Sequence, residues 1–223
     1  MPSKKLPDRI LPIPCSDKSG FKEKWTVGRN LLNFPHPFRM VLTGPPSSGK
    51  STAIKNCIIR AETPFDEIVV VHVDAEGSSE WDDVEAQVIA VMPEPTDFKR
   101  ETKTLLILED LNLKQMAKED RAKLNRLCGY TSSHLGVSIC ITTQNAYDLD
   151  ASIRRMASVF VIFKSPDINA LTILADRVGL KKKDMIHIMT ELLTKTHDSL
   201  WLDLTPGTNW PIRINGFNTY KKI

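Results

Sequence analysis

The feature that most constrains the fold of this chain is the segment Gly44–Ser51, Gly-Pro-Pro-Ser-Ser-Gly-Lys-Ser, which fits the pattern G-x4-G-K-[ST] at every fixed position. A short apolar segment, Phe38–Thr43, precedes it and a helical pattern, Ser51–Glu62, follows it, as the pattern requires. Glycines let successive backbone N–H groups turn inward around an anion, and a helix N-terminus adds its positive dipole. The segment therefore predicts a phosphate-binding loop between a strand and a helix.

The residue types in this loop predict how a nucleotide is held. Lys50 is expected to reach the β- and γ-phosphates, and the hydroxyl of Ser51 is expected to ligate Mg²⁺. ATP and Mg²⁺ are the expected cofactors, and the absence of an Asn-Lys-x-Asp motif for guanine counts against a GTPase. The expected nucleotide-binding residues are Gly44, Pro45, Pro46, Ser47, Ser48, Gly49, Lys50, Ser51 and Thr52.

Apolar strands and helices alternate along most of the chain. Buried strands are predicted at Phe38–Thr43, Glu67–Val73, Thr104–Leu108, Val137–Thr142 and Val159–Phe163, and helices at Ser51–Glu62, Lys118–Cys128, Asp167–Val178 and Lys183–Thr194. A helix and a strand edge are predicted within Trp81–Val91, and a C-terminal β-hairpin in Ser199–Leu204 and Pro211–Ile214. The alternation predicts an α/β fold with three layers and a mostly parallel central sheet. With the phosphate loop, this arrangement resembles the three-layer P-loop NTPases of the additional-strand, RecA-like type.

Two acidic residues follow a strand about sixty residues after the loop. Leu105–Leu108 is apolar throughout and leads directly into Glu109 and Asp110. A buried parallel strand delivers the side chains that follow it to the carboxyl edge of the sheet, beside the phosphate loop. One carboxylate there can hold the Mg²⁺ shell, and the next can orient or deprotonate the attacking water. By position we assign the metal to Glu109 and the water to Asp110, and the reverse assignment stays open.

A polar residue after the next strand is a candidate γ-phosphate sensor. The strand Val137–Thr142 leads into Thr143, Gln144 and Asn145. In additional-strand NTPases such a strand lies between the phosphate-loop strand and the acidic strand, so we expect Gln144 to contact the γ-phosphate or the water. The alternative is that these residues only form a turn.

Composition divides the chain near residue 34. Residues 1–34 contain four prolines and seven Lys or Arg with little periodicity, and this predicts an extended basic arm before an ATPase domain at 35–223. The arm is either a disordered tail or a segment that orders against a neighbouring subunit or nucleic acid. The net charge of +3 hides a basic–acidic–basic division, because Lys and Arg are in excess in residues 1–60 and 121–223, and Asp and Glu in residues 61–120.

Other features narrow the class of protein. No apolar stretch follows the start, and no run approaches the ~18 apolar residues of a membrane span, so neither a signal peptide nor a transmembrane segment is expected. The four cysteines form no Cys-x-x-Cys pair, which argues against a metal cluster or disulfide framework and favours a reducing compartment. The histidines His72, His187 and His197 have no metal-ligand spacing and are interpreted as structural.

Three motifs together resemble the viral genome-packaging ATPases of the FtsK–HerA superfamily, the poxvirus, giant-virus and virophage type in particular. They are the phosphate loop, Leu-Leu-Ile-Leu-Glu-Asp at 105–110, and His-Leu-Gly-Val-Ser-Ile-Cys-Ile-Thr-Thr-Gln-Asn at 134–145. Asp148–Arg155 and the late strand Asp198–Asp203 with Arg213 add to the similarity, which covers roughly residues 36–215. Many relatives have Asp-Asp or Asp-Glu as the acidic pair, and Ser133 stands where they commonly have arginine, so no arginine role is carried over to Ser133.

The resemblance implies a Mg²⁺-dependent ATPase that translocates double-stranded DNA into a preformed capsid. It further implies a homo-oligomeric ring, usually a hexamer, with capsid, portal or membrane-vertex proteins as further partners, in the host cytoplasm (a viral factory) or the virion. A ring needs an arginine that crosses into the neighbouring site. Arg154 and Arg155 are the first candidates and Arg126 the next, the alternative being that they are solvated surface charges.

DNA contact is expected to be electrostatic and independent of sequence. Lys181–Lys183 opens a predicted helix and is either a pore-facing DNA contact or a solvated charged face. Two other functions stay open from the sequence. One is a P-loop nucleotide or nucleic-acid kinase, and the other is a non-translocating ATP switch of the AAA type.

Overall fold

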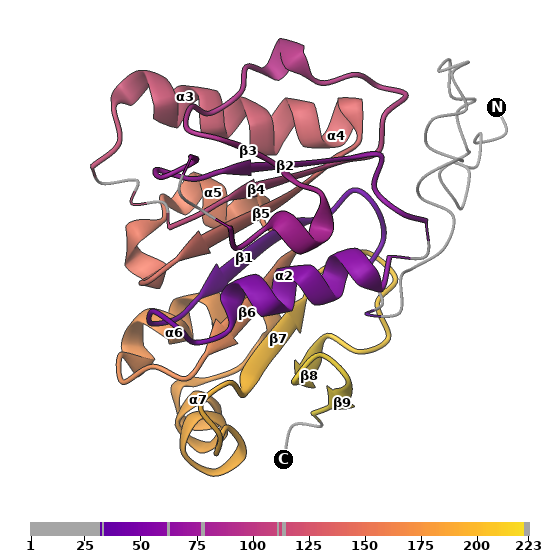
Figure 1. The fold of residues 1–223 in the computed structure, drawn as a ribbon. Helices are drawn as coiled ribbons and strands as arrows, with labels where there is room; N and C mark the ends of the chain where they lie inside the picture. Colours follow the sequence, from indigo (N-terminus) through magenta and orange to yellow (C-terminus); the bar gives the residue numbers. More distant parts are fainter. Residues whose placement is uncertain are drawn as a thin grey trace, which may run out of the picture.

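The computed structural model describes residues 32, 34–61, 63–76, 79–110, 112 and 115–220. Its centre is a nine-stranded sheet in the order β3-β2-β4-β5-β1-β6-β7-β8-β9 (Figure 1). The strands are β1 (Arg39–Thr43), β2 (Glu67–Val71), β3 (Gln87–Ile89), β4 (Thr104–Leu108), β5 (Val137–Thr143), β6 (Val159–Phe163), β7 (Ser199–Asp203), β8 (Ile212–Ile214) and β9 (Asn218–Thr219). The pairs from β3 to β6 are parallel, and those from β6 to β9 are antiparallel.

Helices cover both faces of the sheet, which makes three layers (Figure 1). The α-helices are α2 (Lys50–Ile59), α3 (Lys118–Arg126), α4 (Ser132–Leu135), α5 (Ala151–Met156), α6 (Ile168–Ala175) and α7 (Lys182–His187). The 3-10 turns are η1 (Asp82–Val84), η2 (Pro95–Asp97), η4 (Ala146–Asp148) and η5 (Asp176–Val178), and the π-helical turns are η3 (Leu127–Thr131) and η6 (Ile188–Leu192). This confirms the predicted α/β class, the mostly parallel sheet and the antiparallel C-terminal strands.

Alternation along the strands divides the core between the two faces. In β4, Leu105 and Ile107 pack against the α2 side of the sheet, whereas Leu106 and Leu108 pack against the side that holds α3, α5, α6 and α7. Successive side chains of a strand point to opposite faces, so an apolar run in a central strand fills both layers. The described core also includes Leu32 and Phe34, and the ring of Phe34 stacks on Trp201 with the centroids 5.9 Å apart. Residues 1–31 and 33 of the expected arm lie outside the described residues.

Several boundaries differ from those predicted. Strand β2 ends at Val71 instead of Val73, because its neighbour β4 ends at Leu108, the residue paired with Val71. Helix α2 ends at Ile59 instead of Glu62. Two predicted helices are only partly α-helical, since α3 passes into a π-helical turn at Leu127 and α7 into another at Ile188.

The short strand β9 was not predicted, and its two residues are exposed. Within the part of the chain that the structure describes, no helix combines the length and the apolar character that a membrane crossing needs.

Candidate nucleotide-binding and catalytic site

A cavity of about 760 Å³ opens at the carboxyl ends of the central parallel strands, where α2 begins. It is lined on one side by the phosphate loop and on the other by residues of β7, of the segment before β7 and of the segment after β8. Strand β5 lies between β1 and β4, so Thr43 of β1 is paired with Thr143 and Leu108 of β4 is paired with Ile141. This confirms the expected additional strand between the phosphate-loop strand and the acidic strand.

The phosphate loop is shaped by two glycines. Gly49 has φ 102°, a left-handed conformation that side chains rarely adopt, and it stands directly before α2. Gly44 follows β1, and a Cβ at this position would lie 2.6 Å from the Cβ of Phe163 on the neighbouring strand β6. The residues of the loop that line the cavity are Pro46, Ser47, Ser48, Gly49, Lys50, Ser51 and Thr52. The N–H groups in the first turn of α2 have no partners within the helix, so they are available to an anion.

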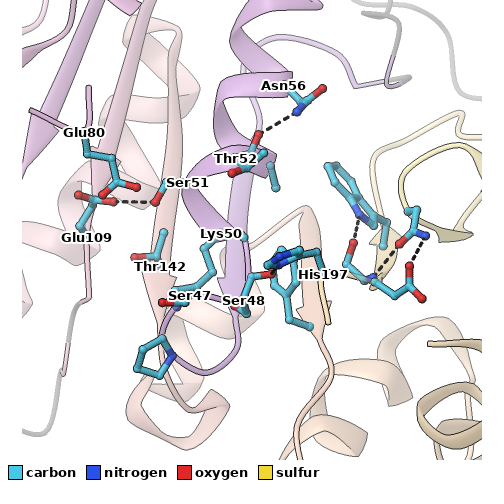
Figure 2. A pocket seen from close by; sticks show the side chains of 18 of the residues that line it. Ser47, Ser48, Lys50, Ser51, Thr52, Asn56, Glu80, Glu109, Thr142 and His197 are labelled. Carbon is cyan, nitrogen blue, oxygen red and sulfur yellow. Dashed lines mark hydrogen bonds between the residues drawn. The ribbon is translucent and has the colours of Figure 1, made fainter. Parts of the chain in front are cut away.

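Lys50 lies across the mouth of the loop (Figure 2). Its ammonium group donates to the carbonyls of Gly44 and Pro45, each at 3.0 Å. Burial lowers the pKa of Lys50, while the carboxylates of Asp110 and Glu109 act in the opposite direction. A phosphate would offer this partly desolvated cation charged oxygens in place of two neutral carbonyls, which favours binding of an anion.

Ser51 and Glu109 meet at the other end of the cavity (Figure 2). The Ser51 hydroxyl donates to Glu109 Oε1 at 3.4 Å. A hydroxyl and a carboxylate are hard oxygen ligands of the kind that Mg²⁺ prefers, and nucleotide phosphates supply more of them. The residues present therefore fit a Mg²⁺ ion held between the loop and the acidic strand, with Ser51 and Glu109 as its protein ligands.

Two side chains that the sequence analysis did not select face the second oxygen of Glu109. The indole N–H of Trp81 donates to Glu109 Oε2 at 3.0 Å, and His72 Nε2 lies 3.9 Å from the same oxygen. Burial raises the pKa of Glu109, the indole hydrogen bond and His72 lower it, and the neighbouring carboxylates of Glu80 and Asp110 raise it. Glu80 also lines the cavity and lies beside Glu109 in Figure 2, so a third carboxylate belongs to this region.

Asp110 has a different environment from Glu109 although the two are adjacent. Its φ is 45°, which is uncommon for a residue other than glycine, and its backbone N–H donates to the Thr142 hydroxyl at 2.8 Å. This turn leaves the Asp110 side chain exposed at the cavity. Thr142 of β5 lines the cavity too. Gln144 is exposed two residues further on and is not among the residues that line the cavity, so Thr142 takes the nearer position in this structure.

The arginines proposed for the subunit interface lie away from the cavity. The Arg154 guanidinium donates to the carbonyls of Ala146 and Leu149. Arg155 and Arg126 are exposed. The end of α5 that carries Arg154 and Arg155 adjoins the start of β1, because Arg39 Nε donates to the Met156 carbonyl at 2.7 Å. In one subunit Arg154 and Arg155 therefore lie near the edge of the sheet that is opposite the cavity. None of the described arginines lines the cavity.

His197 contacts the phosphate loop from the segment before β7. Its Nδ1 lies 3.2 Å from the Ser48 carbonyl oxygen, and a Cβ on Gly49 would lie 3.5 Å from the same nitrogen. A carbonyl only accepts, so Nδ1 carries the proton in this contact.

Two other charged features named from the sequence have different environments. The Lys181–Lys183 run is exposed at the start of α7. Arg213 is buried against Asp203, with 3.4 Å between Nη2 and Oδ2.

The structure adds four side chains to the site that were not selected from the sequence, and only one of them had a signal there. They are His72, Glu80, Trp81 and His197. His72 directly follows β2, the neighbour of β4, so the rule that places polar residues at the carboxyl edge would have selected it. Trp81 and Glu80 belong to a short connection with weak periodicity, and His197 is 149 positions away from Ser48. Their contacts with the site follow from the folding of the chain alone.

No protein-family model matches the chain, and no match was found among curated proteins. Solved structures do match. The genome packaging NTPase of Sulfolobus turreted icosahedral virus 2, in complex with AMPPCP, is 20% identical with a TM-score of 0.58, and the match covers 80% of this chain and 96% of that one. The DNA-packaging ATPase of Sulfolobus turreted icosahedral virus is 17% identical with a TM-score of 0.57, over 80% and 97% of the two chains.

A more distant match shows how far the same architecture extends. The cytoplasmic domain of the type VII secretion ATPase of Thermomonospora curvata is 12% identical with a TM-score of 0.51, over 78% of this chain and 24% of that one. The two viral matches cover nearly all of their own chains, so the architecture is shared as a whole. The chain thus shares the fold of these two viral packaging ATPases, and the fold that its motifs predicted is confirmed.

Proposed function

We propose that this protein is a Mg²⁺-dependent ATPase that uses ATP hydrolysis to translocate double-stranded DNA into a preformed capsid. The observation that carries the proposal is the insertion of β5 between β1 and β4, which brings Lys50, Ser51, Glu109 and Asp110 around one cavity. The two matched viral proteins, a genome packaging NTPase and a DNA-packaging ATPase, share this architecture over nearly their whole length and support the choice of substrate.

Each side chain has a distinct part in hydrolysis. The N–H groups of the loop and Lys50 bind the phosphates and offset their charge. Mg²⁺, when bound, neutralises charge that develops on the phosphate oxygens, and Ser51 and Glu109 would hold it. Asp110, exposed at the cavity, orients the attacking water and accepts its proton. Thr142 fixes the turn of Asp110 through the backbone hydrogen bond, and Gln144 remains the candidate contact to the γ-phosphate at the end of β5.

The cavity lacks an arginine among the described residues, and a ring supplies one from a neighbour. Arg155 is exposed, whereas Arg154 is engaged by two carbonyls of its own chain, so Arg155 becomes the first candidate. A head-to-tail ring, hexameric in this proposal, places the edge of one sheet that carries Arg155 against the cavity of the next subunit. Lys181–Lys183, exposed on each subunit, is the proposed sequence-independent contact with DNA.

The setting follows from the proposed substrate. A motor of this kind would act at a capsid, with portal or membrane-vertex proteins as partners, in the host cytoplasm or the virion.

The test is the steady-state rate of ATP hydrolysis with and without long double-stranded DNA. We expect long DNA to stimulate hydrolysis, and we expect random-sequence fragments of equal length to stimulate equally, because the contacts are with phosphates. Lys50→Ala should lose productive nucleotide binding, and Lys118→Ala is the control for removal of a lysine, because Lys118 is exposed at the start of α3 and does not line the cavity.

Two outcomes would contradict the proposal. Transfer of phosphate to a small hydroxylated acceptor, without stimulation by DNA, would identify a kinase. Tight ATP binding without turnover, on or off DNA, would identify a nucleotide-dependent switch.

A further inference from the structure

The two carboxylate oxygens of Glu109 face different partners. Oε1 accepts the hydrogen bond of Ser51, the loop residue that would share Mg²⁺ with it. Oε2 faces away from the loop, where the Trp81 indole N–H donates to it at 3.0 Å and His72 Nε2 lies at 3.9 Å. The Glu109 side chain is only 8% exposed, so these few neighbours decide its orientation. The carboxylate is held with one oxygen toward the nucleotide and the other toward two N–H groups.

The tautomer of His72 follows from its other nitrogen. Nδ1 accepts the backbone N–H of Asp74 at 3.0 Å, so in the neutral ring the proton is on Nε2. Nε2 is the atom that faces Glu109. The ring therefore presents an N–H toward the same oxygen that accepts from Trp81, at a distance longer than a hydrogen bond.

Trp81 is fixed in place by its surroundings. Its side chain is fully buried in the core on the α2 side of the sheet. Lys55 of α2 lies over the indole ring with 5.6 Å between its ammonium nitrogen and the centroid, and it also pairs with Asp83 at 2.7 Å and donates to the Glu80 carbonyl. The connection that carries Trp81 is thus attached to the helix that begins at the phosphate loop.

We propose that Trp81 and His72 are positioning residues that orient Glu109 for Mg²⁺, and this inference rests on the proposed function. Groups that donate to a ligating carboxylate orient it, and their loss typically costs about 10–100-fold in metal affinity or activity. Neither residue touches the nucleotide in this role. They act through Glu109, so they affect the metal-dependent part of nucleotide binding and leave the metal-free part unchanged.

The test compares nucleotide binding with and without metal. Calorimetry with AMPPCP in EDTA measures metal-free affinity, and a titration with Mn²⁺, followed by its electron paramagnetic resonance signal, measures metal binding to the protein–AMPPCP complex. Trp81→Phe keeps a buried aromatic ring and removes the indole N–H donor. We therefore expect the Mn²⁺ dissociation constant to rise about tenfold, while the affinity for AMPPCP measured in EDTA changes little. Trp210→Phe is the control for loss of an indole, because Trp210 is exposed and is not among the residues that line the cavity, and it should leave the Mn²⁺ constant near the wild-type value.

Substitutions of His72 give a second test of the positioning role. They do not disturb the core, because the His72 side chain is 28% exposed. At 3.9 Å the His72 N–H lies beyond hydrogen-bond range of Glu109 Oε2 and acts on this oxygen as a nearby dipole. His72→Leu removes this N–H and should weaken Mn²⁺ binding severalfold, whereas His72→Gln keeps an N–H near the position of Nε2 and should restore the binding. If Trp81→Phe does not fold, as circular dichroism would show, the pair of His72 variants decides the question.

The outcomes separate the inference from the proposed function. Folded Trp81→Phe and His72→Leu proteins with wild-type Mn²⁺ constants would overturn the positioning role while the ATPase proposal stands. A wild-type protein that binds AMPPCP but no Mn²⁺ would instead overturn the metal site itself.

Discussion

Glu109 and Asp110 are adjacent in the chain but differ in burial, backbone conformation and hydrogen bonding. Glu109 is largely buried, carries a raised pKa because of that burial, and accepts hydrogen bonds at both oxygens. Asp110 is exposed at the cavity on a turn with positive φ. An oriented, enclosed carboxylate suits a metal and an accessible one suits water, and the assignment of the metal to Glu109 and the water to Asp110 stays a prediction.

Substitution of each acid by its amide tests this division. We expect Asp110→Asn to bind ATP normally and to hydrolyse it about 10²–10⁴-fold more slowly, which is the usual contribution of a general base. Glu109→Gln should instead lower the affinity for the metal–nucleotide complex, because an amide is a weaker ligand than a carboxylate. Single-turnover hydrolysis and equilibrium binding measure the two effects. Normal binding with lost hydrolysis in Glu109→Gln alone would mean that the roles are reversed.

His197 was interpreted as structural, and its contact with the phosphate loop gives it a testable part in nucleotide binding. The amide plane joins the Ser48 carbonyl to the Gly49 N–H on its opposite side, so a donor that holds the carbonyl also holds the direction of that N–H. We expect His197→Ala to weaken nucleotide binding about fivefold, the equivalent of one hydrogen bond of about 1 kcal/mol.

Two further variants make the His197 result specific. His197→Asn keeps a donor close to the position of Nδ1 and should recover most of the affinity, while His187→Ala, on α7, should have no effect. Unchanged affinity in His197→Ala, measured by equilibrium titration with a fluorescent ATP analogue, would show that the contact is incidental.

At the scale of elements, the packing of neighbouring strands places the phosphate loop. Strands β1 and β6 are parallel neighbours, and Gly44, the first residue after β1, lies beside Phe163, the last residue of β6. The loop can cross this point only because residue 44 has no side chain. On the other side, β5 separates β1 from β4 and so sets the distance between Lys50 and the acidic pair.

Gly44→Ala should therefore destabilise the protein. The added Cβ would lie 2.6 Å from Phe163 Cβ and 2.9 Å from Ser48 Oγ, and overpacking of this kind costs about 1–3 kcal/mol in the free energy of unfolding. For a chain of this size the expected fall in Tm is about 2–10 °C. Gly129→Ala is the control, because its Cβ would meet nothing closer than Met156 Sδ at 3.6 Å. Equal Tm values for the two variants in thermal unfolding would contradict the prediction.

The elements themselves were largely predictable. The strands Thr104–Leu108 and Val159–Phe163 have the predicted bounds, because each is a run of five apolar or β-branched residues with polar residues at both ends, which mark where the strand begins and ends. The change from α3 to a π-helical turn was not predicted. Leu124, Leu127 and Cys128 are buried with helical spacing, and that spacing does not distinguish a regular helix from one that widens by a residue per turn.

At the scale of the whole molecule, the described part of the subunit forms a site without an arginine. Arg155 is exposed near the opposite edge of the sheet, which is the arrangement that a head-to-tail ring can use and a monomer cannot. Arginines that enter from a neighbour contribute about 10³–10⁵ in rate. The activity is therefore expected to belong to the assembly.

Mixing two inactive variants tests this expectation. Arg155→Ala has an intact site and no arginine to donate, and Lys50→Ala has a defective site and an intact Arg155. Each alone should be nearly inactive, and mixed rings should regain up to roughly a quarter of the wild-type ATPase rate, because a site works only where an Arg155→Ala subunit receives its arginine from a Lys50→Ala neighbour. Absence of complementation with Arg155→Ala, and then with Arg154→Ala, would transfer the role to Arg126.

The sequence by itself determined the chemistry of the loop and the class of the fold, because both depend on short-range order. A phosphate loop needs its glycines, lysine and serine within one segment, here Gly44–Ser51. Buried strands are predicted from runs of about five apolar or β-branched residues, as in Thr104–Leu108. The division of net charge, by contrast, indicated neither the cavity nor its ligands.

Only the tertiary structure decided which side chains surround that chemistry. Trp81 lies 28 positions from Glu109 and His197 lies 149 positions from Ser48, and nothing in their own neighbourhoods marks them as partners. The physical reason is that a hydrogen bond across such separations depends on the order of strands in the sheet and on the path of the connections between them. Those are properties of the folded chain, and the contacts of Trp81 with Glu109 and of His197 with the phosphate loop become visible only there.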